Sequence, residues 1–188
     1  MSLSSVVITG LGVVSPLGNS YEDLIEQLFQ GHSGIAELPS LREVGGLRSR
    51  LAATVKNVDA KQIPRKNRRS MSDMSVYAYL ASMQALTQAD FPHEQLGSGE
   101  LGVAIGSTLG STATSEGFFK DYFQDYSLER MKSGLFFQLM GHSCSANVAQ
   151  SLGITGRVMA LSAACATSCQ AIGYAFEQIA FGKQQAFL

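Results

Sequence analysis

The sequence predicts an α/β fold in which helices cover a sheet of largely parallel strands. Short apolar runs alternate along the chain with longer amphipathic segments of helical spacing. Strands joined by crossover helices form parallel sheets covered by helices, so this order predicts a layered domain. The 188 residues, 45% hydrophobic and 15% charged, suffice for a sizeable core, and no linker or low-complexity segment divides them. We therefore expect one domain, or one half of a larger one.

The first twenty residues combine a short β-branched run with a glycine turn. Residues 6–9 predict a buried strand, and Gly10-Leu11-Gly12 follows it. A dinucleotide-binding turn needs a third glycine and an immediate helix, but Ser15 and Pro16 occupy those positions. The pattern therefore favours a strand that leads into a plain turn over a nucleotide site.

A helix is predicted at residues 21–30 and a turn-rich region after it. Asn19 or Ser20 can cap the helix, and Gly31 ends it. Residues 40–57 are mixed and glycine-containing, which predicts short edge strands or a meander that turns at Gly45-Gly46.

Positive charge is concentrated between residues 42 and 69, which hold nine of the fourteen Lys and Arg residues. Residues 61–69, KQIPRKNRR, carry five of these charges and lead into a helix predicted at residues 70–89. Such a run is either a solvated face or a docking patch for an acidic partner, and the local sequence leaves both interpretations open.

The next predicted strand covers residues 101–105 and ends in the sequence GSTLG. Glycines and hydroxyls at the carboxyl end of a strand are where α/β sheets place ligands, although the P-loop lysine is missing. Residues 118–126 predict an aromatic helix or a mobile flap, and residues 135–152 predict a helix closed by Gly153. Within that helix, GHSCS lacks the final glycine and the preceding strand of a nucleophile elbow, which argues against a serine hydrolase.

The segment with the clearest chemistry is residues 160–181, ALSAACATSCQAIGYAFEQIAF. A strand predicted at residues 157–162 leads into a turn at Cys165, and Cys165 opens a predicted helix that runs to about Phe181. The apolar side of that helix holds Cys169, Ile172, Phe176 and Ile179. The positive end of a helix shifts a thiol towards thiolate, from a free pKa of about 8.5. The central hypothesis is that Cys165 is a nucleophile for acyl transfer, and the alternative is a small buried cysteine.

Two further alternatives concern the cysteines and the compartment. Cys144, Cys165 and Cys169 with His142 could form a zinc site, but the closely spaced cysteine pairs of zinc knuckles are missing. Three cysteines without framework spacing argue for a reducing compartment, and we expect a cytoplasmic protein. A formal net charge of −1 gives no global attraction to nucleic acid or membrane, and no apolar run approaches membrane-spanning length.

Four motifs together carry a family resemblance. VVITGLGVVSPLGN, RRSMSDMSVYAY, GVAIGSTLGS and SAACATS resemble the β-ketoacyl-acyl-carrier-protein synthases, with the type I elongating enzymes closest. The resemblance covers nearly all of the chain in order. It implies a thiolase-like fold of two similar α/β halves in a five-layered αβαβα arrangement with a mixed, largely parallel sheet. It also implies a homodimer with the strand near residues 157–162 at its interface.

The resemblance implies roles for five residues. Cys165 would accept an acyl chain from acyl carrier protein, and its backbone N–H would form one arm of an oxyanion hole. Malonyl-carrier protein would then lose carbon dioxide and attack that thioester, which gives a 3-oxoacyl chain two carbons longer. Lys66 and Arg69 match the docking positions for the acidic carrier protein, and we expect Leu109 and Met140 to line the acyl pocket. We expect no cofactor and no metal.

The family's second half is missing from residues 1–188. That half supplies two histidines and a lysine for decarboxylation, and His32, His93 and His142 stand in none of those motifs. Residues 185–188 predict the beginning of a strand, which suggests that sequence is missing beyond them. We therefore expect this chain, as an N-terminal synthase domain, to be inactive alone. The alternative function is a non-catalytic fragment that binds carrier protein.

Overall fold

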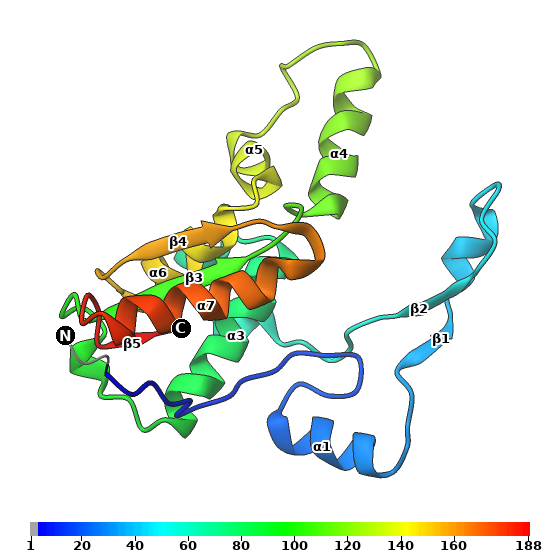
Figure 1. Ribbon diagram of the computed structural model, residues 1–188. Coiled ribbons are helices and arrows are strands. Elements are labelled where there is room, and N and C mark those ends of the chain that lie inside the picture. Colours follow the sequence, from blue (N-terminus) through cyan, green and yellow to red (C-terminus); the bar gives the residue numbers. More distant parts are fainter. Residues whose placement is uncertain (1–3) are drawn as a thin grey trace.

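A computed structural model describes residues 4–188, and its centre is a parallel sheet of three strands (Figure 1). The strands are β3 (Leu101–Gly106), β4 (Val158–Leu161) and β5 (Ala186–Phe187), in the order β4-β3-β5. On one edge of β3, Val103 pairs with Val158 of β4, and on the other edge Leu101 pairs with Ala186 of β5. The predicted α/β class and parallel sheet are confirmed.

The two faces of β3 differ in residue size. Leu101 and Val103 are buried in the hydrophobic core, and Ile105 packs against it. The alternate positions Gly102, Ala104 and Gly106 point to the opposite face, because successive side chains of a strand alternate. A Cβ atom at Gly106 would collide with the methyl group of Thr167, so helix α7 (Thr167–Ala180) lies very close to that face.

The core lies between β3 and two helices, α3 (Asp73–Gln88) and α6 (Ser143–Leu152), which lie behind the sheet in Figure 1. The helix predicted at residues 70–89 is therefore confirmed and begins at Asp73. Val76 and Leu86 of α3 meet Val148 and Leu152 of α6 in this core. Short 3-10 or helical turns connect these elements: η2 (Ala60–Gln62), α2 (Arg65–Arg68) and η3 (His93–Gln95).

The N-terminal segment confirms one prediction and contradicts another. Helix α1 spans Tyr21–Phe29, and the hydroxyl of Ser20 caps it by accepting a hydrogen bond from the N–H of Asp23 at 3.1 Å. The strand predicted at residues 6–9 is wrong: Val7 is 74% and Ile8 82% exposed, and residues 4–14 belong to no sheet. Their β-branched composition favours a strand, but no neighbouring strand within the described chain pairs with them.

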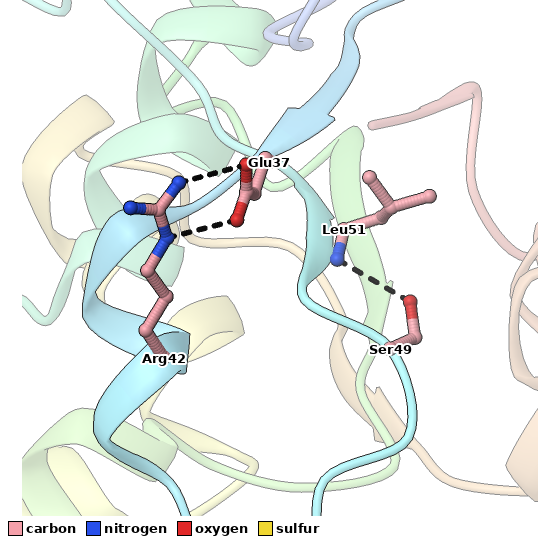
Figure 2. Close-up of polar contacts among 4 residues, drawn as sticks. All are labelled: Glu37, Arg42, Ser49 and Leu51. Carbon is pink, nitrogen blue, oxygen red and sulfur yellow. Dashed lines mark hydrogen bonds and ion pairs between the residues drawn. The ribbon is translucent and has the colours of Figure 1, made fainter.

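Residues 35–53 form a hairpin that extends away from the sheet (Figure 1). Strands β1 (Ile35–Glu37) and β2 (Leu51–Ala53) pair antiparallel around the turn η1 (Pro39–Glu43). Strand β2 lies in the region predicted to hold short strands, whereas β1 precedes it, and the two form a sheet of their own. Figure 2 shows the guanidinium of Arg42 donating to both carboxylate oxygens of Glu37, at 2.9 and 3.0 Å. The hydroxyl of Ser49 accepts a hydrogen bond from the N–H of Leu51 at 3.3 Å.

Helices α4 (Thr112–Phe123) and α5 (Ser133–Leu139) form an arm that rises above the sheet in Figure 1. The single helix predicted at residues 135–152 is wrong, because α5 ends at Leu139 and α6 begins at Ser143. Met140 between them is extended, with φ −80° and ψ 136°. A Cβ atom at Gly110 would collide with the carbonyl oxygen of Leu139, so the two segments are in close contact there. Within residues 4–188, no helix is long and apolar enough to cross a membrane.

Candidate active site

Cys165 lies at the sharp bend between strand β4 and helix α7. It is the middle residue of the 3-10 turn η4 (Ala164–Ala166), so it precedes the first residue of α7 instead of opening the helix as predicted. Ala164 has a φ of 48°, in the left-handed region. This conformation costs a residue with a Cβ atom about 1–3 kcal/mol, so the surrounding structure must hold the bend in place.

The buried side chain of Thr167 holds this bend. Thr167 is 5% exposed, and its hydroxyl accepts a hydrogen bond from the N–H of Ala163 at 2.8 Å. The same hydroxyl donates to the carbonyl oxygen of Ala164 at 2.8 Å. These two bonds close the turn around Cys165 and offset the strain at Ala164. The thiol therefore sits on a fixed backbone at the amino end of α7, where N–H groups lack intrahelical partners.

The loop after β3 lies beside the cysteine turn. The hydroxyl of Thr108 donates to the carbonyl oxygen of Ala164 at 3.2 Å, and the N–H of Ser107 donates to Leu161 at 3.1 Å. Two segments far apart in the sequence thus meet at the carboxyl ends of parallel strands, where α/β folds bind ligands. Leu109, in this loop, is 64% exposed, and Met140 is half-buried across the Gly110–Leu139 contact.

The three cysteines differ in exposure. Cys165 and Cys169 are exposed, whereas Cys144 is 1% exposed and its thiol donates weakly to the carbonyl oxygen of Met74 at 3.8 Å. Burial raises the pKa of Cys144 to about 11, because the core solvates its thiolate poorly. The buried-cysteine interpretation therefore applies to Cys144 and not to Cys165.

The apolar side of α7 does not face the sheet. Ile172 is 69% and Phe176 50% exposed, and Cys169 lies on the same side of the helix. The residues that α7 buries are smaller or polar, such as Thr167 and Ala171, because the sheet approaches so closely. The exposed side chains of Ile172 and Phe176 therefore form an apolar surface on the same helix that follows Cys165.

The predicted docking residues lie on the short helix α2 and at its end. Lys66 and Arg69 are both exposed, and neither forms an ion pair with any residue between 4 and 188. Arg68 differs, because its guanidinium donates to the carbonyl oxygen of Ala60 at 2.9 Å and so braces the segment. The structure thus leaves at least two of the basic side chains available to a partner.

The zinc and hydrolase alternatives gain no support from the geometry. The described part of the chain holds no group of three or more His, Cys, Asp or Glu side chains that could bind a metal ion. Ser143, the middle residue of GHSCS, is fully buried at the beginning of α6. Two cavities of about 590 and 450 Å³ lie along α3, and neither is lined by Cys165.

Comparison with known proteins identifies the family. Residues 3–188 match the family described as "Beta-ketoacyl synthase, N-terminal domain", and the chain therefore belongs to the β-ketoacyl synthases. Its curated relatives include 3-oxoacyl-[acyl-carrier-protein] synthase 1 of Haemophilus influenzae, 34% identical over 178 residues, and of Escherichia coli, 35% identical over 183 residues. These alignments cover 95% and 97% of this chain but only 44% and 45% of the relatives. The resemblance to the N-terminal half of the type I enzymes is confirmed.

A solved structure supports the same conclusion for the fold. The crystal structure of a β-ketoacyl synthase from Burkholderia phymatum matches 98% of this chain and 45% of its own, at 36% identity and a TM-score of 0.88. The fold is thus that of the thiolase-like ketosynthases. The described chain also contains polar residues that the sequence did not single out, Thr167, Gln138 and Asn147. The one available signal for Thr167 was a hydroxyl two residues after Cys165, in the turn that leads into the predicted helix.

Proposed function

We propose that the chain is the N-terminal half of a 3-oxoacyl-acyl-carrier-protein synthase, in which Cys165 is the nucleophile that accepts the acyl chain. The observation that carries this proposal is the exposed thiol of Cys165 on a braced turn before α7, in a chain of the β-ketoacyl synthase family. The buried Cys144 is a poor nucleophile at neutral pH because its pKa is raised to about 11.

The first half-reaction is a thioester exchange. The Cys165 thiolate attacks the carbonyl carbon of an acyl thioester on carrier protein, and the carbonyl oxygen becomes an oxyanion. The N–H of Cys165 donates to that oxyanion, and one such donor is commonly worth about 3 kcal/mol. When the tetrahedral intermediate collapses, the carrier thiolate leaves and the acyl group remains on Cys165. A thiolate suits this step because it attacks well and leaves readily when carbon attacks in the next step.

The second half-reaction needs groups that this chain does not carry. By the resemblance, malonyl-carrier protein loses carbon dioxide, and its carbanion attacks the Cys165 thioester to form a 3-oxoacyl product. The decarboxylating histidines and lysine would come from the other half of the fold. Residues 1–188 are thus an N-terminal domain that loads an acyl chain but does not condense alone.

The partner and assembly follow from the surface. An acidic acyl carrier protein would dock on Lys66 and Arg69, with charge that mainly accelerates encounter and makes it salt-sensitive. The acyl chain would pass between Leu109 and Met140. A homodimer would form along β4, which has a neighbour on only one side in the described sheet. We expect the protein to act in the cytoplasm.

Acyl loading provides the test. Incubation with an acyl-carrier protein should add the mass of the acyl group to the chain, and peptide mapping should place it on Cys165. Cys165→Ala should abolish the adduct, while the matched variant Cys169→Ala should retain it. An adduct on Cys169 alone, or no adduct while carrier protein binds, would count against the nucleophile role.

A second function, carrier-protein binding without catalysis, is favoured by the exposed charges at Lys66 and Arg69, which form no ion pair within residues 4–188. Lys66→Glu should weaken binding of the acidic carrier protein by about tenfold and reduce its salt dependence, as for a charge reversal at an interface. Lys183→Glu, the same reversal far from α2 in the sequence, is the control. Binding that Lys66→Glu weakens and Lys183→Glu does not, combined with no acyl adduct on the unaltered chain, would favour the binding function. Binding that is indifferent to both variants would contradict docking at Lys66.

A further inference from the structure

The segment that follows α2 is hydrogen-bonded to two different helices. The carbonyl oxygen of Arg69 accepts a hydrogen bond from the side-chain amide of Gln138 on α5, at 3.3 Å. Ser70 is bonded to Asn147 on α6 in both directions: its hydroxyl donates to the Asn147 side-chain oxygen at 2.7 Å, and its carbonyl accepts from the amide at 3.0 Å. Hydrogen bonds from residues 69 and 70 thus connect the proposed docking surface to α5 and to α6.

The interruption between these helices is where Met140 lies. The N–H of Met140 donates to Phe137 at 3.2 Å, and its carbonyl accepts from Ser143 at 3.0 Å, so the turn belongs to both α5 and α6. Gln138 also reaches the loop on the other side, because its backbone carbonyl accepts a hydrogen bond from the N–H of Ser111 at 3.4 Å. One residue therefore contacts the docking segment through its side chain and the loop after β3 through its backbone.

The two ties differ in strength. Asn147 is 1% exposed and makes a third hydrogen bond, to the hydroxyl of Ser75 at 3.3 Å, so its tie is a buried network. The Gln138 tie is a single, longer and exposed bond. Exposed hydrogen bonds open at low free-energy cost, whereas buried networks open only with larger unfolding. The hydrogen bonds between Ser70 and Asn147 therefore stay formed, whereas the hydrogen bond between Arg69 and Gln138 can open and close.

We infer that Gln138 is a positioning residue that transmits carrier-protein docking at Lys66 and Arg69 to the acyl pocket at Met140 and Leu109. The inference rests on the proposed function, since it assumes that an acidic carrier protein binds this surface. An anionic partner that orders the Arg69 side chain also fixes its backbone carbonyl, which strengthens the bond to Gln138. Gln138 then holds the turn at Met140 and the loop at Ser111 in one arrangement.

The test follows the Met140 methyl group by NMR in a chain labelled with 13C-methyl methionine. Assignment uses Met140→Leu, and the unlabelled titrant is an acidic acyl-carrier protein. In the unaltered chain, saturation with carrier protein should shift the Met140 methyl resonance. Gln138→Leu, which keeps a neutral side chain of similar size, should lose most of that shift and keep a dissociation constant close to that of the unaltered chain. Gln124→Leu, at an exposed glutamine of the arm without side-chain hydrogen bonds in the described chain, should keep the shift.

The outcomes separate the inference from the proposed function. No binding to the unaltered chain would overturn the docking proposal itself. Binding without a Met140 shift, or a shift of equal size in Gln138→Leu, would overturn the coupling and leave docking in place. Loss of the shift together with a lower unfolding midpoint in Gln138→Leu would point to structural damage. In that case Gln138→Asn, which keeps the amide but is too short to reach Arg69, must reproduce the loss at an unchanged midpoint for the inference to stand.

Discussion

Selective alkylation of the cysteines tests the candidate nucleophile directly. The perturbation is a brief treatment of the folded chain with iodoacetamide at pH 8. Cys144 has its pKa raised to about 11 by burial, so only about 0.1% of it is thiolate at that pH. An ordinary exposed thiol, with a pKa of about 8.5, is about one quarter thiolate. Ionisation alone therefore makes such a thiol roughly 200-fold more reactive than Cys144.

Burial widens this difference further. Cys144 is 1% exposed, so the reagent reaches it only when α6 opens away from α3. The proposed role of Cys165 requires it to react at least as fast as a small reference thiol, because a nucleophile must be both ionised and accessible. We therefore expect Cys165 to be alkylated at least about 100-fold faster than Cys144.

The assay is a time course of quenched samples, digested and analysed by mass spectrometry for each cysteine peptide. Cys165→Ser provides the background rate, and treatment in denaturant shows that all three peptides are detected. Equal rates at Cys165 and Cys144 in the folded chain would refute the reasoning. A rate at Cys165 well below that of the reference thiol would refute the nucleophile assignment alone.

Two further predictions concern stability. Because burial raises the pKa of Cys144 from 9.0 to about 11, the folded state holds the thiol proton more tightly than the unfolded state. The free energy of unfolding should therefore fall as pH rises from about 9 to 11, by at most about 2–3 kcal/mol. Urea unfolding measures this fall, and Cys144→Ala should lack the contribution of the thiol. Asn147→Ala should lower the unfolding free energy by about 1–3 kcal/mol, because the buried Ser75 and the half-buried Ser70 lose their hydrogen bonds to the Asn147 side chain, whereas Asn67→Ala should cost much less; equal costs would contradict the network around Asn147.

The helices and central strands of this fold could be predicted from local patterns, and the failures have physical causes. The cap at Ser20 and the run at residues 101–105 encode their elements locally, through hydrogen bonding and burial. The strand at residues 6–9 fails because a strand needs a neighbour, and none in the described chain is near enough to pair. The break at Met140 fails because it depends on a contact between Gly110 and Leu139, which are distant in the sequence.

The candidate site was predictable in part for the same reason. Cys165 precedes a helix in a run of small residues, a pattern that is visible in the sequence. The brace that Thr167 provides was less visible, because its role depends on the left-handed Ala164 and on the closeness of Gly106. The ties from Arg69 and Ser70 to Gln138 and Asn147 span about seventy positions in the sequence, and no local pattern reports them.

The two faces of strand β3 should tolerate substitutions to different degrees, because one face carries large side chains and the other mostly glycine. On the core side, Leu101 and Val103 can exchange with other large apolar residues at modest cost, since a core accepts changes that keep its volume. On the α7 side, Gly102 has no space for a single added carbon, because a Cβ atom would clash with the ring of Phe187 and lie 3.0 Å from the carbonyl oxygen of Arg157. At Gly106 the obstacle is Thr167, the residue that holds the cysteine turn. The position of the Cys165 thiol therefore depends partly on the absence of a side chain at Gly106 of β3.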